Sequence, residues 1–168
     1  MSKKRCDNPC VVFPKRFNEN GKPLCGVCGT LLKGRQRRWC SQECSNHVNI
    51  VTSPSFARHK VYQRDKGVCA KCGHDTQKLK RILRIARGRR YTSLDKRDLN
   101  MFEEREIKKL LGYTRQNHLW EMDHILPVVE GGGLCGLEGL QTLCIPCHRI
   151  DTKELAARRA KARRKLND

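Results

Sequence analysis

The sequence is poor in the residues that build a large hydrophobic core. Its aromatic residues are four Phe, three Tyr and two Trp, and hydrophobic residues make up 38% of the 168 positions. No apolar run approaches the ~20 residues of a membrane helix, and no apolar segment follows the basic residues 1–5, so we expect neither a membrane span nor a signal peptide. A small domain with so thin a core usually needs metal ions or disulfides for stability.

Negative charge is also scarce. Asp and Glu number 17 against 36 Lys and Arg, which gives a net charge of +19. The basic residues cluster in 33–38, 78–90 and 153–165, a distribution that favours a nucleic-acid partner over a merely solvated surface. Charge alone does not separate DNA from RNA and does not show that chemistry takes place.

Cysteine, by contrast, is abundant. The count of eleven is odd, so at least one thiol lies outside any disulfide framework. Without a signal peptide we expect an intracellular, reducing compartment, where paired cysteines bind zinc more often than they oxidise. The cysteines fall into two groups along the chain, which predicts an N-terminal zinc-binding module over 1–52 and a second domain over 53–168.

Four close cysteine pairs predict two structural zinc sites. Tetrahedral Zn²⁺ accepts four thiolates, and a two- or three-residue gap lets one turn direct two sulfurs at the same ion. We assign one site to the first two pairs and the other to the last two, which are far apart in the chain. In sequence order the ligands are Cys25, Cys28, Cys40 and Cys44 for the first zinc, and Cys69, Cys72, Cys144 and Cys147 for the second.

The remaining cysteines are less informative. Cys6 and Cys10 either join a third site with a histidine such as His47 or are unpaired thiols, and we favour the second interpretation. Cys135 is expected to be a small packed or free thiol. We expect the other histidines outside the candidate site to be surface or core residues: His59, His74 and His118.

Hydrophobic periodicity and turn residues predict an α+β fold. Ser53 and Pro54 begin a helix that ends before Gly67, and Gly88 and Gly112 end two more helices. A strand, a glycine loop, a second short strand and a basic helix complete the chain. The expected helices cover 53–65, 76–87, 93–111 and 147 onwards, and the expected strands cover 120–129 and 140–143.

Two short motifs carry candidate catalytic groups. Asp123 and His124 lie in the first predicted strand, and His148 directly follows Cys147. A carboxylate and an imidazole can hold one divalent cation while leaving positions open for phosphate oxygens and water. A local bend of the strand would let His124 act as a general base on the attacking water.

These motifs resemble the HNH (ββα-metal) endonuclease family, including bacterial and phage HNH nucleases and the HNH domains of vertebrate annealing helicase-endonucleases. The matching segments are 120–127, 131–133 and 140–148. The resemblance implies that Asp123 and His148 bind a catalytic Mg²⁺ or Mn²⁺, that His124 is the general base, and that the second cysteine set holds zinc. It also implies hydrolysis of phosphodiester bonds, with 5′-phosphate and 3′-hydroxyl products.

One position departs from the family pattern. The family usually has an Asn just before the Leu-Gln segment, and Gly139 stands there in this chain.

From the motifs and the charge together we expect an HNH endonuclease that acts on duplex or branched DNA. The alternatives are a non-catalytic zinc protein that binds nucleic acid and an RNase on the same fold. The expected nucleic-acid contacts lie in the last helix at Arg149, Lys153, Arg158 and Arg159.

Overall fold

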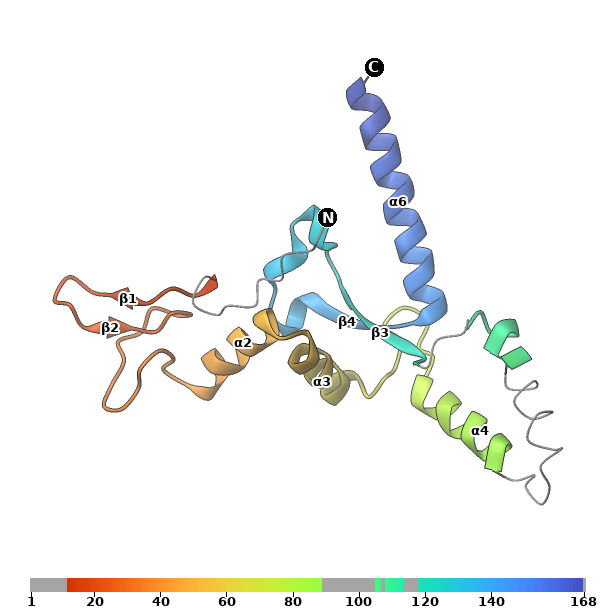
Figure 1. Ribbon diagram of the computed structural model, residues 1–168, viewed down its shortest axis with the longest axis horizontal. Coiled ribbons are helices and arrows are strands. Elements are labelled where there is room, and N and C mark those ends of the chain that lie inside the picture. The colour runs from red at the N-terminus through yellow and green to blue at the C-terminus, as the bar shows by residue number, and fades with distance from the viewer. Residues whose placement is uncertain (1–11, 89–104, 107, 114–117, 168) are drawn as a thin grey trace. The chain divides into compact units, whose positions relative to one another are not determined.

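The computed structural model describes residues 12–88, 105–106, 108–113 and 118–167 (Figure 1). The chain divides into two compact units, one formed by Met1–Gln63 with His124–Leu140 and the other by Arg64–Asp123 with Gln141–Asp168. The domain boundary expected between residues 52 and 53 stays a prediction.

The first unit begins with a small hairpin in which β1 (Arg16–Phe17) pairs antiparallel with β2 (Pro23–Leu24). Two consecutive helices follow, α2 (Gln42–Thr52) and α3 (Pro54–Asp65), which bury Val48, Ala57 and Val61.

Ser53 separates the two helices. Its backbone N–H donates to Asn49 O at the end of α2, and its Oγ accepts from Phe56 N (3.4 Å) at the start of α3. The predicted helix start at Ser53 and Pro54 is thus confirmed. Helix α2 was not expected from the sequence, although Ser41 is its N-cap and accepts from Cys44 N (3.2 Å).

In the second unit, α4 (Thr76–Gly88) confirms the helix expected over 76–87. Asp75 caps it, because Oδ1 accepts from Gln77 N and Lys78 N (both 2.9 Å). Leu79 and Leu83 face a buried cluster that also includes Cys69, Tyr113, Leu119, Leu143, Cys144 and Ile145. The helix expected over 93–111 lies mostly outside the described residues, but 105–106 and 108–110 are helical, and Gly112 (φ 76°) follows them.

β3 (Trp120–His124) and β4 (Leu140–Cys144) form a two-stranded sheet. Ile125 N donates to Gly139 O (2.9 Å) at one end and Ile145 N donates to Leu119 O (3.2 Å) at the other, a pattern that makes the strands antiparallel. Helix α6 (Ile145–Asn167) follows β4 directly. The predicted α+β order of strand, loop, strand and helix is therefore confirmed.

Two boundaries differ from the sequence-based expectation by two residues or more. The first strand ends at His124 instead of continuing to residue 129, because Pro127 has no N–H for a ladder and its carbonyl accepts from Glu130 N and Gly132 N instead. Short 3₁₀ turns then cover Val128–Glu130, Gly132–Leu134 and Leu137–Gly139. The last helix begins at Ile145, two residues before Cys147.

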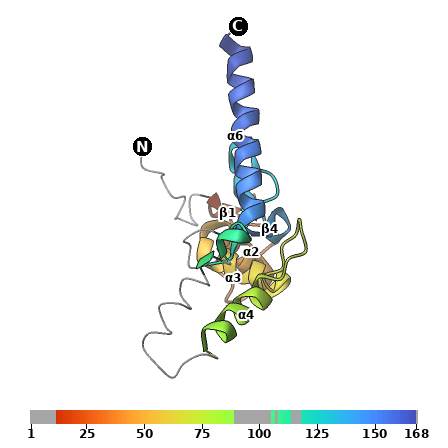
Figure 2. The ribbon, with the colours of Figure 1, turned by 90° about the vertical axis from the view of Figure 1, so that its right-hand side faces the viewer.

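Gly132 makes this loop possible. A Cβ at this position would lie 1.7 Å from Leu126 O, so no other residue fits without moving the backbone. From Thr152 onward α6 projects from the second unit (Figure 2). The side chains from Thr152 to Lys165 are exposed except that of Leu155, which is half-buried. Among the described residues, no helix combines the length and the apolar character that crossing a membrane requires.

Candidate metal centres and active site

The first cysteine tetrad comes together in the first unit. The ligand atoms of Cys25, Cys28, Cys40 and Cys44 all lie within 4.8 Å of one another, with 3.3 Å between the sulfurs of Cys28 and Cys40 and 3.6 Å between those of Cys40 and Cys44. Four sulfurs bonded tetrahedrally to Zn²⁺ at ~2.3 Å are separated by roughly 3.8 Å. The four cysteines therefore fit a structural zinc ion.

A tight turn arranges the first pair of this tetrad. Gly29 N donates to Cys25 O (2.9 Å), and Cys25 N donates to Thr30 O (2.8 Å). Gly29 has φ 75°, a conformation that residues with a Cβ rarely adopt. The glycine after the second cysteine is thus required by the turn that directs both sulfurs to one point.

The second tetrad repeats this arrangement in the second unit. The sulfurs of Cys69, Cys72, Cys144 and Cys147 likewise lie within 4.8 Å of one another, with 3.7 Å between those of Cys72 and Cys144. The turn is equivalent, since Gly73 N donates to Cys69 O (2.9 Å) and Gly73 has φ 69°. Ala70 N also donates to Thr142 O (2.8 Å), which fastens this turn to β4, the strand that ends at Cys144.

The electrostatics of both tetrads call for a cation. Contact with the Thr30 hydroxyl lowers the pKa of Cys28 to about 6, whereas contact with Cys28 and Cys44 raises the pKa of Cys40 to about 12. In the second tetrad, burial raises the pKa of Cys144 to about 11. Thiols this close cannot all ionise together unless a positive ion offsets their repulsion, and a zinc ion supplies that charge.

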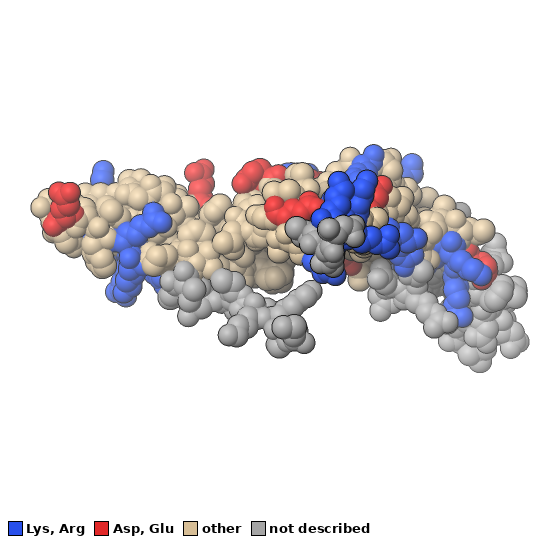
Figure 3. All heavy atoms as spheres, turned by 90° about the horizontal axis from the view of Figure 1, so that it is seen from above, with Lys and Arg blue, Asp and Glu red and all other residues tan. Residues whose placement is uncertain are grey.

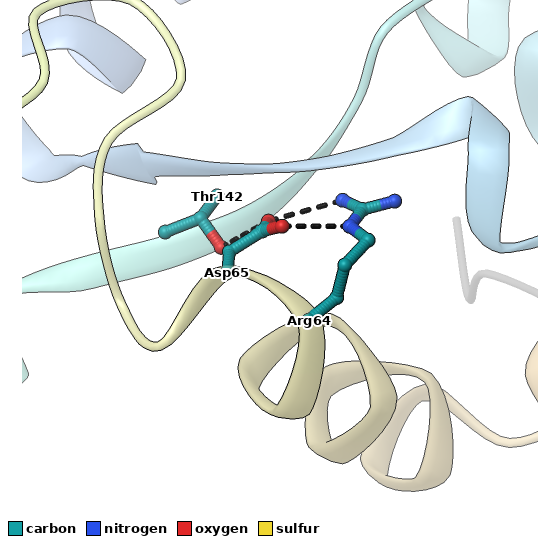
Figure 4. Close-up of polar contacts among 3 residues, drawn as sticks. All are labelled: Arg64, Asp65 and Thr142. Carbon is teal, nitrogen blue, oxygen red and sulfur yellow. Dashed lines mark hydrogen bonds and ion pairs between the residues drawn. The ribbon is translucent and has the colours of Figure 1, made fainter.

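A polar cluster of Arg64, Asp65 and Thr142, which no local sequence pattern predicts, supports the second tetrad. Thr142 Oγ1 donates to Asp65 Oδ2 (2.8 Å), and Arg64 donates to both oxygens of the same carboxylate through Nε (2.6 Å) and Nη2 (3.0 Å) (Figure 4). Thr142 is fully buried. The Arg64 guanidinium, and next the Thr142 hydroxyl, lower the pKa of Asp65, so the carboxylate is ionised in the folded protein.

The three candidate catalytic residues lie at the junction of strand and helix elements. Asp123 and His124 are the last two residues of β3, and His148 lies in the first turn of α6, directly after Cys147. All three side chains are half-buried. Within the part of the chain that the structure describes, only the two cysteine tetrads gather three or more potential ligands within 4.8 Å, so the roles of these three residues stay predictions.

The last helix carries the predicted nucleic-acid contacts. Eight Lys or Arg residues and two acidic residues lie in α6, and Figure 3 shows the basic side chains gathered around the end of this helix. Lys153, Arg158 and Arg159 are exposed. Arg149 differs from them, because its Nη1 donates to Gly112 O (3.1 Å) and so packs against its own unit.

Cys135 occupies the space beside Gly139. A Cβ at Gly139 would lie 2.4 Å from Cys135 Cβ and 2.7 Å from Cys135 Sγ. The main chain holds this part of the loop, since Gly139 N donates to Gly136 O (3.2 Å) and Gly139 O accepts from Ile125 N. The absence of a side chain at residue 139 therefore leaves room for the side chain of Cys135.

Comparison with known proteins gives three similar curated relatives and one solved structure. The relatives are the DNA annealing helicase and endonuclease ZRANB3 of Mus musculus (31% identical over 167 residues), Bos taurus (33% over 162) and Homo sapiens (32% over 162). These matches cover 90–94% of this chain, but the chain spans only 15–16% of the length of those relatives. No protein-family model matches the chain.

The solved structure is the crystal structure of the human ZRANB3 HNH domain. It shares 30% sequence identity with this chain, and the match covers 68% of this chain and 98% of the solved one, with a TM-score of 0.44. Because nearly the whole solved domain is matched at this identity, the sequence relationship, and not the superposition, establishes the family.

Proposed function

Because this chain belongs to the HNH endonuclease family and carries a nuclease-type HNH domain, we propose that it is a metal-dependent endonuclease that hydrolyses phosphodiester bonds in DNA. The observation that carries the proposal is the placement of the motif residues. Asp123 and His124 end β3, and His148 lies in the first turn of α6 next to Cys147 of the second tetrad.

In this proposal, Asp123 and His148 hold the catalytic ion. A carboxylate oxygen and an imidazole nitrogen suit Mg²⁺ or Mn²⁺, whereas the thiolates of the tetrads suit zinc, so the two kinds of ion are kept apart by their ligands. A bound divalent ion would stabilise negative charge on the phosphate and on the leaving 3′ oxygen. Both ligands lie in the same unit and are half-buried.

His124 is proposed to accept the proton of the attacking water. Its side chain and that of Asp123 leave a regular strand on opposite faces, which separates the base from the metal ligand. The strand ends at His124, where Pro127 and the 3₁₀ turns change the direction of the chain. In this proposal, the change of direction supplies the local bend by which His124 would reach the attacking water.

Duplex or branched DNA is the proposed substrate. Lys153, Arg158 and Arg159 lie on the exposed part of α6, where phosphate contacts would release counterions. The thiol ligands of both tetrads suit a reducing compartment, where cysteines stay reduced and can bind zinc.

The test compares wild type with His124→Ala on plasmid, linear duplex and branched DNA and on RNA, with and without Mg²⁺ or Mn²⁺. We expect metal-dependent cutting of DNA that falls by ~10²–10⁴-fold in the variant, the range for a positioned general base. His59→Ala, which changes an exposed histidine of α3, is the matched control and should cut normally. Cleavage by His124→Ala at the wild-type rate would falsify the assignment, and cutting of RNA alone would replace DNA as the substrate.

A further inference from the structure

A hollow of about 310 Å³ lies in the first unit, between the β1–β2 hairpin and the segment that leads to Cys40. Its volume is at the lower end of the ~300–1,000 Å³ typical of small-ligand sites. Neither the candidate catalytic residues nor the basic part of α6 contributes to it. The lining residues that matter for its chemistry are Phe13, Lys15, Arg16, Phe17, Arg37, Arg38 and Trp39.

The aromatic side of the hollow is held rigidly. The rings of Phe13 and Trp39 meet edge to face with 6.1 Å between their centroids, and the Arg38 guanidinium lies 5.3 Å from the centroid of Trp39. Arg38 Nη2 also donates to Phe13 O (3.4 Å). A Cβ on Gly26 would lie 2.8 Å from Trp39 Cζ3, so the indole can pack against the zinc-binding turn only because residue 26 is glycine.

One aromatic ring of the hollow remains in contact with solvent. The side chain of Phe17 on β1 is 59% exposed. Leaving so large an apolar ring in water gains nothing for folding, because its hydrophobic surface is not buried. A ligand with a flat apolar face would cover it.

The charge of the hollow selects the class of ligand. Four of its lining residues are basic, and none of the described residues that line it is acidic. Aromatic rings beside basic side chains are the combination by which proteins bind single-stranded nucleic acid, where bases stack on the rings and phosphates contact the cations. Duplex DNA offers the phosphates but keeps its bases stacked inside, so a duplex would leave Phe17 uncovered.

We propose that this hollow binds an unpaired nucleotide of a single-stranded nucleic acid segment, with its base on Phe17 and its phosphate beside Arg37 and the neighbouring basic residues. The zinc tetrad at Cys25, Cys28, Cys40 and Cys44 holds two lining residues of the hollow in place. These are Gly26, which follows Cys25, and Trp39, which precedes Cys40. The inference rests on the nucleic-acid partner of the proposed function, but it does not require cleavage.

The test measures equilibrium binding by the full zinc-loaded chain without Mg²⁺ or Mn²⁺. The probes are a fluorescent oligothymidylate, an oligouridylate of equal length and a duplex of equal length. Phe17→Ala should weaken binding of the single strands about 5- to 150-fold, the range for one lost base–aromatic stack, and change duplex binding less than about twofold. Phe17→Trp keeps a ring and should bind like wild type. The oligothymidylate and oligouridylate arms show which of the two strands the hollow prefers.

Two matched controls separate the hollow from the general surface. Leu110→Ala removes another exposed apolar side chain, 84% exposed, in the other unit, and should change nothing. Arg37→Gln should weaken single-strand binding more than Arg35→Gln, because both residues are exposed in the same segment but only Arg37 lines the hollow.

Three results would overturn the proposal: single-strand binding unchanged in Phe17→Ala, an equal loss for single strands and duplex, or failure of Phe17→Trp to bind despite normal zinc content. Because the catalytic ion is left out, a chain that never cuts DNA would still give a decisive binding result. Conversely, cutting with normal single-strand binding in Phe17→Ala would leave the proposed nuclease standing and this inference refuted.

Discussion

The hydroxyl of Thr142 donates to the carboxylate of Asp65, 77 residues earlier in the chain, over 2.8 Å. The bond joins the centre of β4 to the last residue of α3. The carbonyl of Thr142 meanwhile accepts from Ala70 N, inside the first turn of the second tetrad. One fully buried residue therefore connects the two segments that must meet for Cys69 and Cys72 to share an ion with Cys144 and Cys147.

Thr142→Val should lower the free energy of unfolding of the second unit by ~1–3 kcal/mol. The replacement keeps the shape but leaves the ionised Asp65 carboxylate with one donor fewer, and hydrogen bonds to charged groups are worth roughly this much. Chemical denaturation measures it. Thr152→Val, which removes an exposed hydroxyl that bonds within α6, is the control. A change below ~0.5 kcal/mol at residue 142, typical of surface positions, would show that the bond contributes little.

The stability that Asp65 supplies should depend on pH. Arg64, and next Thr142, lower the pKa of this carboxyl in the folded protein below its ordinary value of 3.8. A carboxyl whose pKa is lower in the folded than in the unfolded protein stabilises the folded state fully at pH values above its unfolded pKa. This stabilisation is lost as the pH falls through the pKa of the folded protein. The difference in unfolding free energy between wild type and Asp65→Asn should therefore be constant near neutral pH and shrink below pH ~4.

Zinc is released from both proteins at acid pH, and this release lowers the unfolding free energy of each. Because the measured quantity is the difference between wild type and Asp65→Asn, this shared contribution cancels. If the difference instead grew as the pH fell, Asp65 would be protonated in the folded state, and its ion pair with Arg64 would not form.

The sequence predicted much of this fold because the informative signals are local. Close cysteine pairs, the Ser53–Pro54 helix start and the glycines after helices each depend on neighbours in the chain. The end of β3 was misplaced because the apolar run to Val129 looked like a strand, whereas Pro127 and the close approach of Gly132 to Leu126 O impose turns. Asp65 with Thr142 could not be found, since nothing local marks a hydrogen bond across 77 residues.

In the functional regions too, features marked by local sequence patterns were predictable, and features built from separate segments were not. The two tetrads were predictable from spacing, and their sulfurs lie together as expected. The aromatic and basic hollow was not, because its walls come from two segments separated by the first zinc-binding turn.

The purified protein should contain two tightly bound zinc ions per chain, as measured by elemental analysis. Cys28→Ser should lose one of them and unfold the region around the first tetrad, and Cys72→Ser should do the same for the second, because structural zinc supplies folding free energy directly. Cys135→Ser is the control, since this thiol belongs to neither tetrad and should keep both ions. Less than one zinc per wild-type chain would rule out the two-site assignment.

Restoring the family residue with Gly139→Asn should lower both stability and cleavage rate. The new Cβ would lie 2.4 Å from Cys135 Cβ, so the loop between β3 and β4 must shift, and such overpacking costs ~1–3 kcal/mol. Gly139→Ala should share most of the defect, because the Cβ alone causes the clash. Gly133→Ala is the control within the same loop, where the nearest atom to a new Cβ is Val128 Cγ1 at 3.2 Å.

The double variant Cys135→Gly with Gly139→Asn tests whether the two positions depend on each other. Removing the whole Cys135 side chain clears the space that the Asn would fill, so the double variant should recover stability and single-turnover cleavage relative to Gly139→Asn alone. Cys135→Ala with Gly139→Asn should recover much less, since the Cβ of residue 135 is itself the nearest contact. A misplaced catalytic group can cost ~10²-fold in rate. A double variant that returns His124 to its place would therefore show an easily measured gain in cleavage rate. If Gly139→Asn alone cut DNA faster than wild type, then the native loop would be under-organised, and the packing of Cys135 against Gly139 would not be what holds it.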